Sequence, residues 1–239
     1  MDTSKKELLK LLTQNTHYHA YQLFEWMLDD VLADIIGQRK KFPPPLEAVP
    51  AIREISGCYA KCVKLGREFE DILGDVYQEI AASSTQKHFG QYFTPFSVAT
   101  LMAQMTMGDL RQYQSDDRIC TVMEPACGSG AMILAFARAA MNKYGPDILP
   151  YLSFTAIDKD SVCARMCAVQ FMSNLFVHRL TLGEICVYSG NSLTFEDFKL
   201  IVHASKPGYT PPPADDPKKL TQIRSAALAK THGEQISLF

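Results

Sequence analysis

The sequence predicts an α/β protein with a helical N-terminal domain followed by an open sheet of about four parallel strands. Apolar residues recur every three to four positions over residues 4–36 and again over residues 51–82, which is the spacing of helices that bury one face. Pro43-Pro44-Pro45 places a stiff link between these two regions. Further along, short apolar runs alternate with helical patterns, and this alternation is typical of a parallel sheet covered on both faces.

The candidate strands are four apolar runs in the second half of the chain, at residues 119–123, 151–157, 185–190 and 198–203. After the last run the chain becomes rich in proline, and a short helix is expected over residues 220–230. We therefore expect a helical domain at residues 1–88, a sheet domain at residues 89–205, and a linker with a tail at residues 206–239.

Composition and charge exclude several protein classes. Hydrophobic residues make up 47% of the chain, which is enough for a large core, and the net charge of −2 lacks the basic signature of an autonomous nucleic-acid-binding protein. Only residues 199–239 are basic, with six Lys and Arg against three Asp and Glu. No signal-type run or membrane-length apolar stretch occurs, so we expect a cytoplasmic protein without a membrane partner.

The cysteines favour packing over chemistry. The chain has seven, an odd number without the spacing of a secreted disulfide framework. Cys58/Cys62 and Cys163/Cys167 lie four residues apart in helical patterns, whereas structural zinc sites favour tighter Cys-x-x-Cys spacing. We interpret both pairs as small buried side chains, and assign no metal ligands.

The segment MEPACGSGAMIL, residues 123–134, is the candidate binding turn. Gly128 and Gly130 follow a predicted strand and precede a predicted helix, so the backbone can turn sharply and let a ligand approach the free N–H groups of the helix. Glu124 and Asp158 end the first two strands, where ligands of open α/β sheets bind. Asp158 is placed to accept hydrogen bonds from a ribose, although a solvated strand-end charge is the simpler alternative. Its distance from the turn is longer than the dinucleotide fingerprint requires, which disfavours nicotinamide cofactors.

These residues resemble a known family. EPACGSGAMIL is similar to the cofactor motif of S-adenosylmethionine-dependent DNA adenine-N6 methyltransferases, in particular the modification subunits of type I restriction enzymes. GQYFTP, residues 90–95, resembles the segment that in this family closes over the methionine end of the cofactor, and FEDILGDVYQEI resembles the helix before it. The resemblance covers residues 69–203. It implies a partial Rossmann-like methyltransferase core and S-adenosyl-L-methionine, or S-adenosylhomocysteine, as the cofactor.

The resemblance also implies roles for individual residues. Phe93, Thr94 and Pro95 line the methionine pocket, and Asp158 holds the ribose. Asn191 stands where the family usually has Asp to accept the adenine amino group, and its carbonyl oxygen still offers an acceptor. The full set of expected cofactor-binding residues is Gln91, Phe93, Thr94, Pro95, Glu124, Ala126, Gly128, Gly130, Asp158 and Asn191.

The catalytic signature departs from the family pattern. The family's fourth strand ends in Asn/Asp-Pro-Pro-Phe/Tyr, which holds a flipped adenine, whereas this chain has HASKPGY at residues 203–209. Ser205, Lys206, Pro207 and Tyr209 occupy this degenerate position, and no catalytic residue is assigned. Only 36 residues follow His203, whereas the methyltransferase fold continues with about three more strands.

Three functions remain open at this point. The chain is a DNA adenine-N6 methyltransferase of the restriction-modification type, completed by a partner subunit or a second copy; or it is a catalytically silent cofactor-binding or interaction protein descended from one. A methyltransferase with an RNA or protein substrate is the weaker third alternative.

The last five residues, QISLF, carry a separate expectation. Gln235, Leu238 and Phe239 resemble the Gln-x-x-Leu-Phe motif by which bacterial proteins bind the replication sliding clamp, which would bring this weakly charged protein to DNA. The alternative is that the apolar end docks onto this protein's own core.

Overall fold

The computed structural model describes residues 3–37, 43–83, 93–194, 196–207 and 235–237. Short 3-10 helices occupy Leu46–Ala48 and Pro146–Tyr151. The α-helices are α1 Thr3–Thr13, α2 Ala20–Ile36, α3 Val49–Leu65, α4 Leu73–Ser83, α5 Phe96–Thr106, α6 Arg111–Ser115, α7 Ala131–Tyr144 and α8 Ser161–Val177. The strands are β1 Cys120–Glu124, β2 Leu152–Asp158, β3 Glu184–Asn191, β4 Glu196–Ser205 and β5 Gln235–Ser237.

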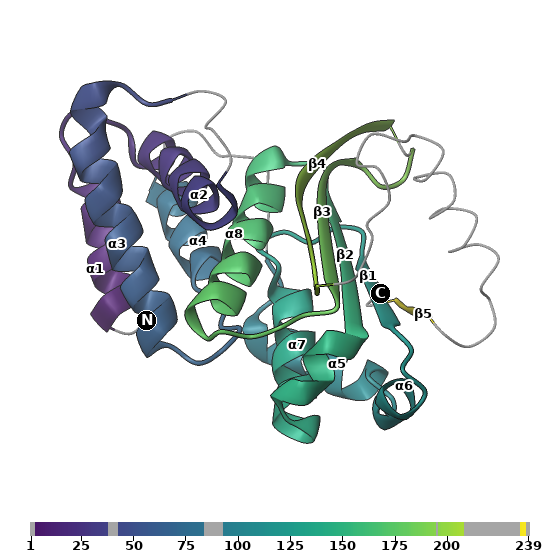
Figure 1. Ribbon diagram of the computed structural model, residues 1–239. Helices are drawn as coiled ribbons and strands as arrows, with labels where there is room; N and C mark the ends of the chain where they lie inside the picture. Colours follow the sequence, from purple (N-terminus) through teal and green to yellow (C-terminus); the bar gives the residue numbers. More distant parts are fainter. Residues whose placement is uncertain (1–2, 38–42, 84–92, 195, 208–234, 238–239) are drawn as a thin grey trace.

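The strands form one sheet in the order β4-β3-β2-β1-β5 (Figure 1). β1 runs parallel to β2 and β5, and β2 runs parallel to β3. This confirms an α/β fold with a mostly parallel sheet.

The expectation that residues 198–203 form a parallel strand is wrong, because β4 runs antiparallel to β3. Parallel neighbours need a crossover of a dozen or more residues, whereas only a short turn joins β3 to β4. The side chain of Asn191 shapes this turn, since its Oδ1 accepts hydrogen bonds from the N–H groups of Leu193 and Thr194 at 3.0 and 3.3 Å.

The end of the chain contributes a strand. Gln235, Ile236 and Ser237 pair with residues 121–123 of β1. The expectation that Gln235 belongs to a clamp-binding peptide is unsupported, and the alternative in which the apolar end docks on the core stays a prediction. Leu238, Phe239, Gln91, Tyr209 and the helix expected at 220–230 lie outside the described residues.

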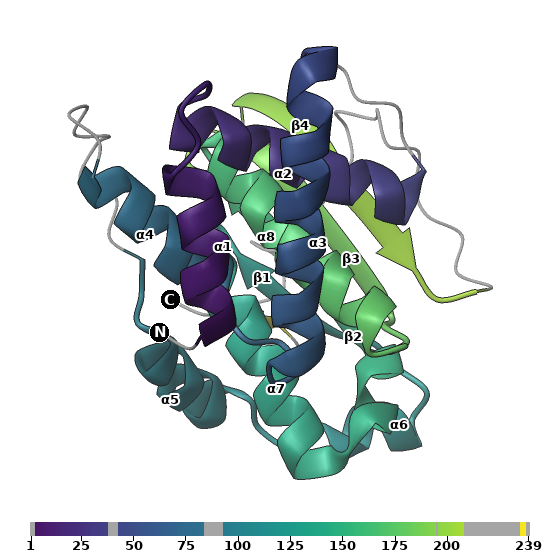
Figure 2. The same ribbon diagram turned by 90° about the vertical axis from the view of Figure 1, so that its left-hand side faces the viewer.

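The helices form layers on one face of the sheet. α7 and α8 lie against that face, and α1–α4 lie beyond α8 (Figures 1 and 2). α8 is buried along nearly its whole length because the sheet covers one side of it and α2 and α3 cover another. In the described part of the chain, the opposite face of the sheet has no covering helix (Figure 1).

The first helical region is two helices rather than the single helix that its apolar spacing suggests. The chain bends between α1 and α2, where Asn15 Oδ1 accepts hydrogen bonds from the N–H groups of His17 and Tyr18 at 2.9 and 3.0 Å. Such side-chain capping of the backbone competes with helix continuation. Among the described residues, none of the helices has the length and apolarity needed to cross a membrane.

The helical region and the sheet share one hydrophobic core. The ring of Phe171 on α8 lies 5.1 Å from Phe69, which precedes α4, and 5.1 Å from Phe154 on β2. Arg165 reinforces the junction between α8 and α2 through ion pairs of 2.6 and 2.7 Å to Glu25 and Asp29. The domain boundary expected at residue 88 falls outside the described residues and stays a prediction.

Phe171→Ala should lower the free energy of unfolding by about 3–5 kcal/mol, because it removes a fully buried ring from the centre of the shared core. Phe176 on the same helix is the matched control: it is 68% exposed, and Phe176→Ala should change stability by about 0.5 kcal/mol or less. Urea unfolding measures both variants.

Unfolding should also be a single transition. Fluorescence of Trp26, the single tryptophan, reports on the helical layer, while circular dichroism reports on the whole protein. Two separated midpoints in the wild-type protein would contradict the shared core.

Candidate functional site

The glycine turn joins β1 to α7 at the carboxyl edge of the sheet. Gly128 and Gly130 both have positive φ, at 52° and 95°, so any larger residue would strain the backbone there. A Cβ on Gly128 would lie 3.0 Å from the ring of Phe93, and a Cβ on Gly130 would lie 3.0 Å from Cys167 Sγ. The turn is thus closely packed on both sides, by Phe93 of the GQYFTP segment and by Cys167 of α8.

Asp158 holds the turn to the end of β2. Its Oδ2 accepts a hydrogen bond from the N–H of Gly128 at 2.8 Å, and its Oδ1 accepts one from the N–H of Asp160 at 2.8 Å. Burial raises the pKa of the Asp158 carboxyl, and these two hydrogen bonds oppose the rise. Each oxygen keeps a second lone pair, so the carboxylate can still accept hydrogen bonds from a ligand.

Glu124 is a buried carboxylate with an unused acceptor. Its side chain is fully buried, and Oε1 accepts a hydrogen bond from the N–H of Ala126 at 3.1 Å. Within the described residues, Oε2 has no hydrogen-bond partner. Burial raises the pKa of this carboxyl to about 7, the hydrogen bond from Ala126 opposes the rise, and the charge of Asp158 adds to it. A cationic ligand beside Oε2 would satisfy the lone pairs and favour the ionised form.

Other predicted residues lie at the same edge of the sheet or beside it. Thr94 and Pro95 are exposed, and the backbone of Pro95 starts α5 by accepting hydrogen bonds from Val98 and Ala99. Asn191 ends β3, and its side-chain oxygen accepts hydrogen bonds from its own turn. The adenine-recognition role predicted for Asn191 must therefore share that oxygen with the turn.

The degenerate catalytic segment lies at the wrong edge of the sheet. Because β4 is antiparallel, Ser205 pairs with Glu184 at the start of β3, and the N–H of Lys206 donates to the carbonyl of Gly183 at 3.0 Å. Ser205 and Lys206 of the degenerate catalytic position therefore lie at the amino edge of the sheet, away from the glycine turn. A parallel fourth strand would have ended at the same edge of the sheet as Glu124 and Asp158.

A buried polar network behind the turn was missed at the sequence level. Ser129 Oγ donates to Asp71 Oδ2 at 2.7 Å, and Gln170 Nε2 donates to Asp71 Oδ1 and to the carbonyl of Ser129, both at 2.8 Å. Gln170 Oε1 accepts from the N–H groups of Ile72 and Leu73. Burial raises the pKa of the Asp71 carboxyl, and the hydrogen bonds from Ser129, Gln170 and Gly74 oppose this rise.

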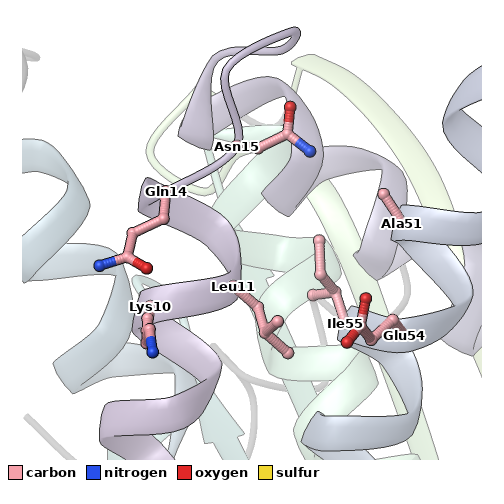
Figure 3. Close-up of a pocket in the computed structure, with 7 residues that line it drawn as sticks. All are labelled: Lys10, Leu11, Gln14, Asn15, Ala51, Glu54 and Ile55. Atoms are coloured by element: carbon pink, nitrogen blue, oxygen red, sulfur yellow. The ribbon is translucent and has the colours of Figure 1, made fainter.

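A surface pocket of about 210 Å³ lies elsewhere, between α1 and α3 (Figure 3). Its walls combine apolar side chains with exposed polar ones, and Figure 3 shows them on α1, on the turn just after it and on α3. The lining residues are Lys10, Leu11, Gln14, Asn15, Ala51, Glu54 and Ile55. None of them belongs to the strand ends, so this pocket is separate from the candidate site.

A comparison with models of known protein families shows the family to which the chain belongs. A family model described as N-6 DNA methylase matches residues 68–212, more than half of the sequence. The chain belongs to the N-6 DNA methylase family. The match includes Asp71, Phe93, the glycine turn and Asp158. It does not include α1–α3.

Relatives within this family include type I restriction enzyme methylase subunits. The chain is 26% identical over 138 residues to the MjaVIII methylase subunit of Methanocaldococcus jannaschii, covering 57% of this chain and 21% of that protein. It is 28% identical over 125 residues to the MjaVII methylase subunit of the same organism, covering 52% and 19%. The chain thus spans about a fifth of the length of these curated relatives.

Two solved structures are similar over part of the chain. A modification subunit of a type I restriction enzyme from Vibrio vulnificus has a TM-score of 0.42 at 17% identity, covering 69% of this chain and 32% of that one. A protein described as a class I S-adenosylmethionine-dependent methyltransferase, from Listeria monocytogenes, has a TM-score of 0.42 at 13% identity, covering 76% and 52%.

Glu124 should make the stability of this N-6 DNA methylase family member depend on pH. The pKa is about 7 in the folded protein against 4.5 for the unperturbed group, so the folded state binds more protons between these values. Stability is then highest below pH 4.5 with respect to this group and falls as the pH rises through 7.

Glu124→Gln should therefore be more stable than the wild type at pH 8, by about 2–3 kcal/mol, and the difference should disappear near pH 4.5. Urea unfolding at several pH values measures this. Glu79→Gln, which removes an exposed carboxylate on α4, is the control. A pH-independent difference between Glu124→Gln and the wild type would contradict the assignment.

Proposed function

We propose that the carboxyl edge of the sheet binds S-adenosylmethionine and that the chain serves DNA adenine-N6 methylation of the restriction-modification type. The observation that carries the proposal is the buried carboxylate of Glu124, whose Oε2 lacks a partner in the described residues, next to a turn in which Gly128 and Gly130 have positive φ and close neighbours. When bound, this cofactor supplies a methyl group on a positively charged sulfonium, and it also carries an ammonium group.

The residues present fit such a ligand. Glu124 and Asp158 supply two carboxylates at neighbouring strand ends, and charge-assisted hydrogen bonds to a cation or to hydroxyl groups would satisfy them. Phe93 is half-buried against the turn, and its ring centroid lies 5.6 Å from that of Tyr77, so these two rings would give the cofactor site an aromatic wall. Asp158 would accept hydrogen bonds from the ribose hydroxyls through the lone pairs that its two backbone partners leave unused.

Transfer to adenine needs groups that the described residues do not bring to this edge. β4 carries Ser205 and Lys206 to the opposite edge, so they cannot hold an adenine beside Asp158. We therefore propose that the adenine-binding contacts come from a partner subunit or a second copy, with DNA as the shared partner. The alternative of a silent cofactor-binding protein draws on the same observation and predicts binding without transfer under all conditions.

Asp158→Ala should weaken S-adenosylmethionine binding about 10- to 100-fold, because a charge-assisted contact contributes about 1.5–3 kcal/mol. Isothermal titration calorimetry with the full chain measures the affinity. Asp147→Ala is the matched control, since Asp147 is exposed and precedes the amino end of β2. Equal affinity in the wild type and Asp158→Ala would remove Asp158 from the site.

The purified chain alone should bind the cofactor and transfer no tritiated methyl group to mixed-sequence DNA. The physical reason is that, among the described residues, β4 carries Ser205 and Lys206 away from the carboxyl edge, where the adenine would have to be held. Strong N6-methyladenine formation by the chain alone, abolished by Asp158→Ala, would show that the chain completes its own active site and would overturn this part of the proposal.

A further inference from the structure

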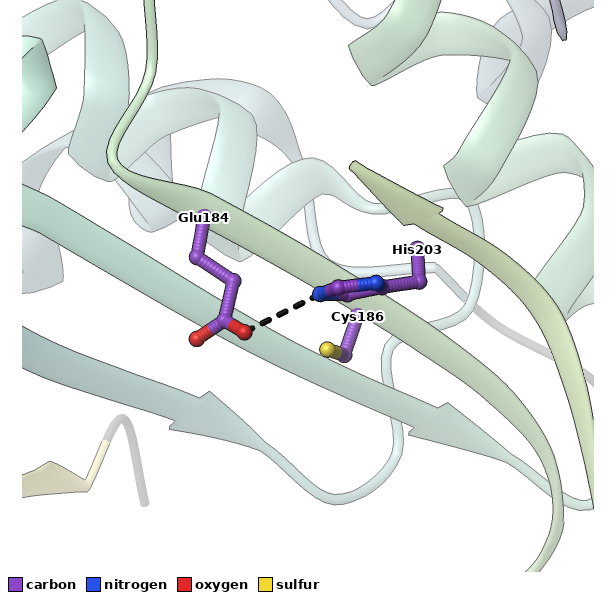
Figure 4. A group of neighbouring side chains, drawn as sticks. All are labelled: Glu184, Cys186 and His203. Carbon is purple, nitrogen blue, oxygen red and sulfur yellow. Dashed lines mark hydrogen bonds and ion pairs between the residues drawn. The ribbon is translucent and has the colours of Figure 1, made fainter. Parts of the chain in front are cut away.

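Three side chains with metal-binding atoms gather on the β3–β4 hairpin. Glu184 and Cys186 project from β3, and His203 projects from β4 directly across from Cys186 (Figure 4). One ligand atom from each residue lies within 4.8 Å of the other two, and His203 Nε2 is 3.1 Å from Glu184 Oε1. All three residues are half-buried.

The alternation of side chains between the two faces of the sheet sets this arrangement. Ile185 and Val187 point toward α8 and are buried, so the intervening Glu184 and Cys186 point to the other face of the sheet. In the described part of the chain, no helix covers that face (Figure 1). The three side chains are half-buried rather than enclosed, and the antiparallel ladder holds their Cα positions fixed.

We propose that Glu184, Cys186 and His203 form a binding site for a borderline-soft divalent cation, with Zn²⁺ as the best match. Thiolate, imidazole and carboxylate together are the ligands that zinc uses, whereas Ca²⁺ and Mg²⁺ require oxygen ligands. With the thiol deprotonated, the carboxylate and thiolate carry two negative charges, which neutralise the ion. Three protein ligands leave the fourth tetrahedral position open to water.

The distances suit a tetrahedral ion. Zinc–ligand bonds of about 2.0–2.3 Å place neighbouring ligand atoms roughly 3.3–3.8 Å apart. The distance of 3.1 Å from His203 Nε2 to Glu184 Oε1 is close to this range, and Cys186 Sγ lies within 4.8 Å of a ligand atom of each of the other two residues. When no ion is bound, His203 and Glu184 interact with each other through this hydrogen bond.

A supporting contact fixes the carboxylate. Ser153 on β2 donates its hydroxyl to Glu184 Oε2 at 2.8 Å, which leaves Oε1 facing His203. Metal-binding carboxylates are commonly oriented by such a hydrogen bond. The site lies toward the opposite edge of the sheet from the glycine turn, so the inference stands apart from the proposed cofactor function.

Cobalt(II) and zinc(II) titrations of the full, untagged chain test the site. We expect one Co²⁺ per chain, with a thiolate-to-cobalt charge-transfer band in the near ultraviolet and with visible bands of tetrahedral intensity. Zn²⁺ should displace the cobalt and raise the melting temperature by about 5–10 °C at a hundredfold excess over its dissociation constant.

Variants distinguish a specific three-ligand site from nonspecific metal binding to a thiol. Cys186→Ser should abolish the charge-transfer band, and His203→Gln should weaken Co²⁺ binding by about tenfold or more, while circular dichroism shows that both variants remain folded. His17→Gln, which replaces an exposed histidine in the helical region, should bind like the wild type. A wild-type chain without the charge-transfer band, or equal Co²⁺ affinity in the wild type and His203→Gln, would overturn the proposal.

Discussion

The carboxamide of Gln170 is the contact on which the arrangement of the site depends. It projects from α8 and bonds at once to Asp71, to the carbonyl of Ser129 in the glycine turn, and to the N–H groups of Ile72 and Leu73 at the start of α4. An amide buried in this way must have every donor and acceptor satisfied, because an unpaired polar group in the interior costs about 1–3 kcal/mol. This requirement fixes the relative positions of three segments that lie far apart in the sequence: α8, the start of α4 and the glycine turn.

This network explains why the helical layer and the turn form a single unit. The segment before α4 supplies the ring of Phe69 to the core. The backbone N–H of Phe69 donates to Oδ1 of Asn174 at 2.6 Å, and Asn174 lies one helical turn after Gln170 on α8. α4 then supplies Tyr77, whose ring contacts Phe93 beside Gly128. The position of the aromatic wall at the candidate cofactor site is thus set by polar contacts on the far side of the turn.

Much of the site was predictable, and the failures have identifiable causes. Gly128, Gly130, Glu124 and Asp158 follow from strand ends and turn chemistry, which are local properties. The direction of β4 was misjudged because an apolar run looks the same in either direction, although the short link after Asn191 argued for a hairpin. Gln170 and Asn174 lie four residues apart on one face of α8, but their partners at residues 69–73 and 129 are distant in the sequence, so no local pattern points to them. The Glu184–Cys186–His203 group depends on the hairpin register, which no motif within a single strand reveals.

The pairing of β5 with β1 has a kinetic consequence. Residues 121 and 235 are paired although more than 100 positions separate them, so this ladder closes one of the longest loops in the chain. Contacts of such high sequence separation form late in folding, after the local helix and hairpin contacts. Until then the outer edge of β1 offers unpaired backbone groups beside the glycine turn, and an exposed strand edge is a template for association with other chains. We therefore expect aggregation during refolding to compete most strongly at the step in which β5 is added.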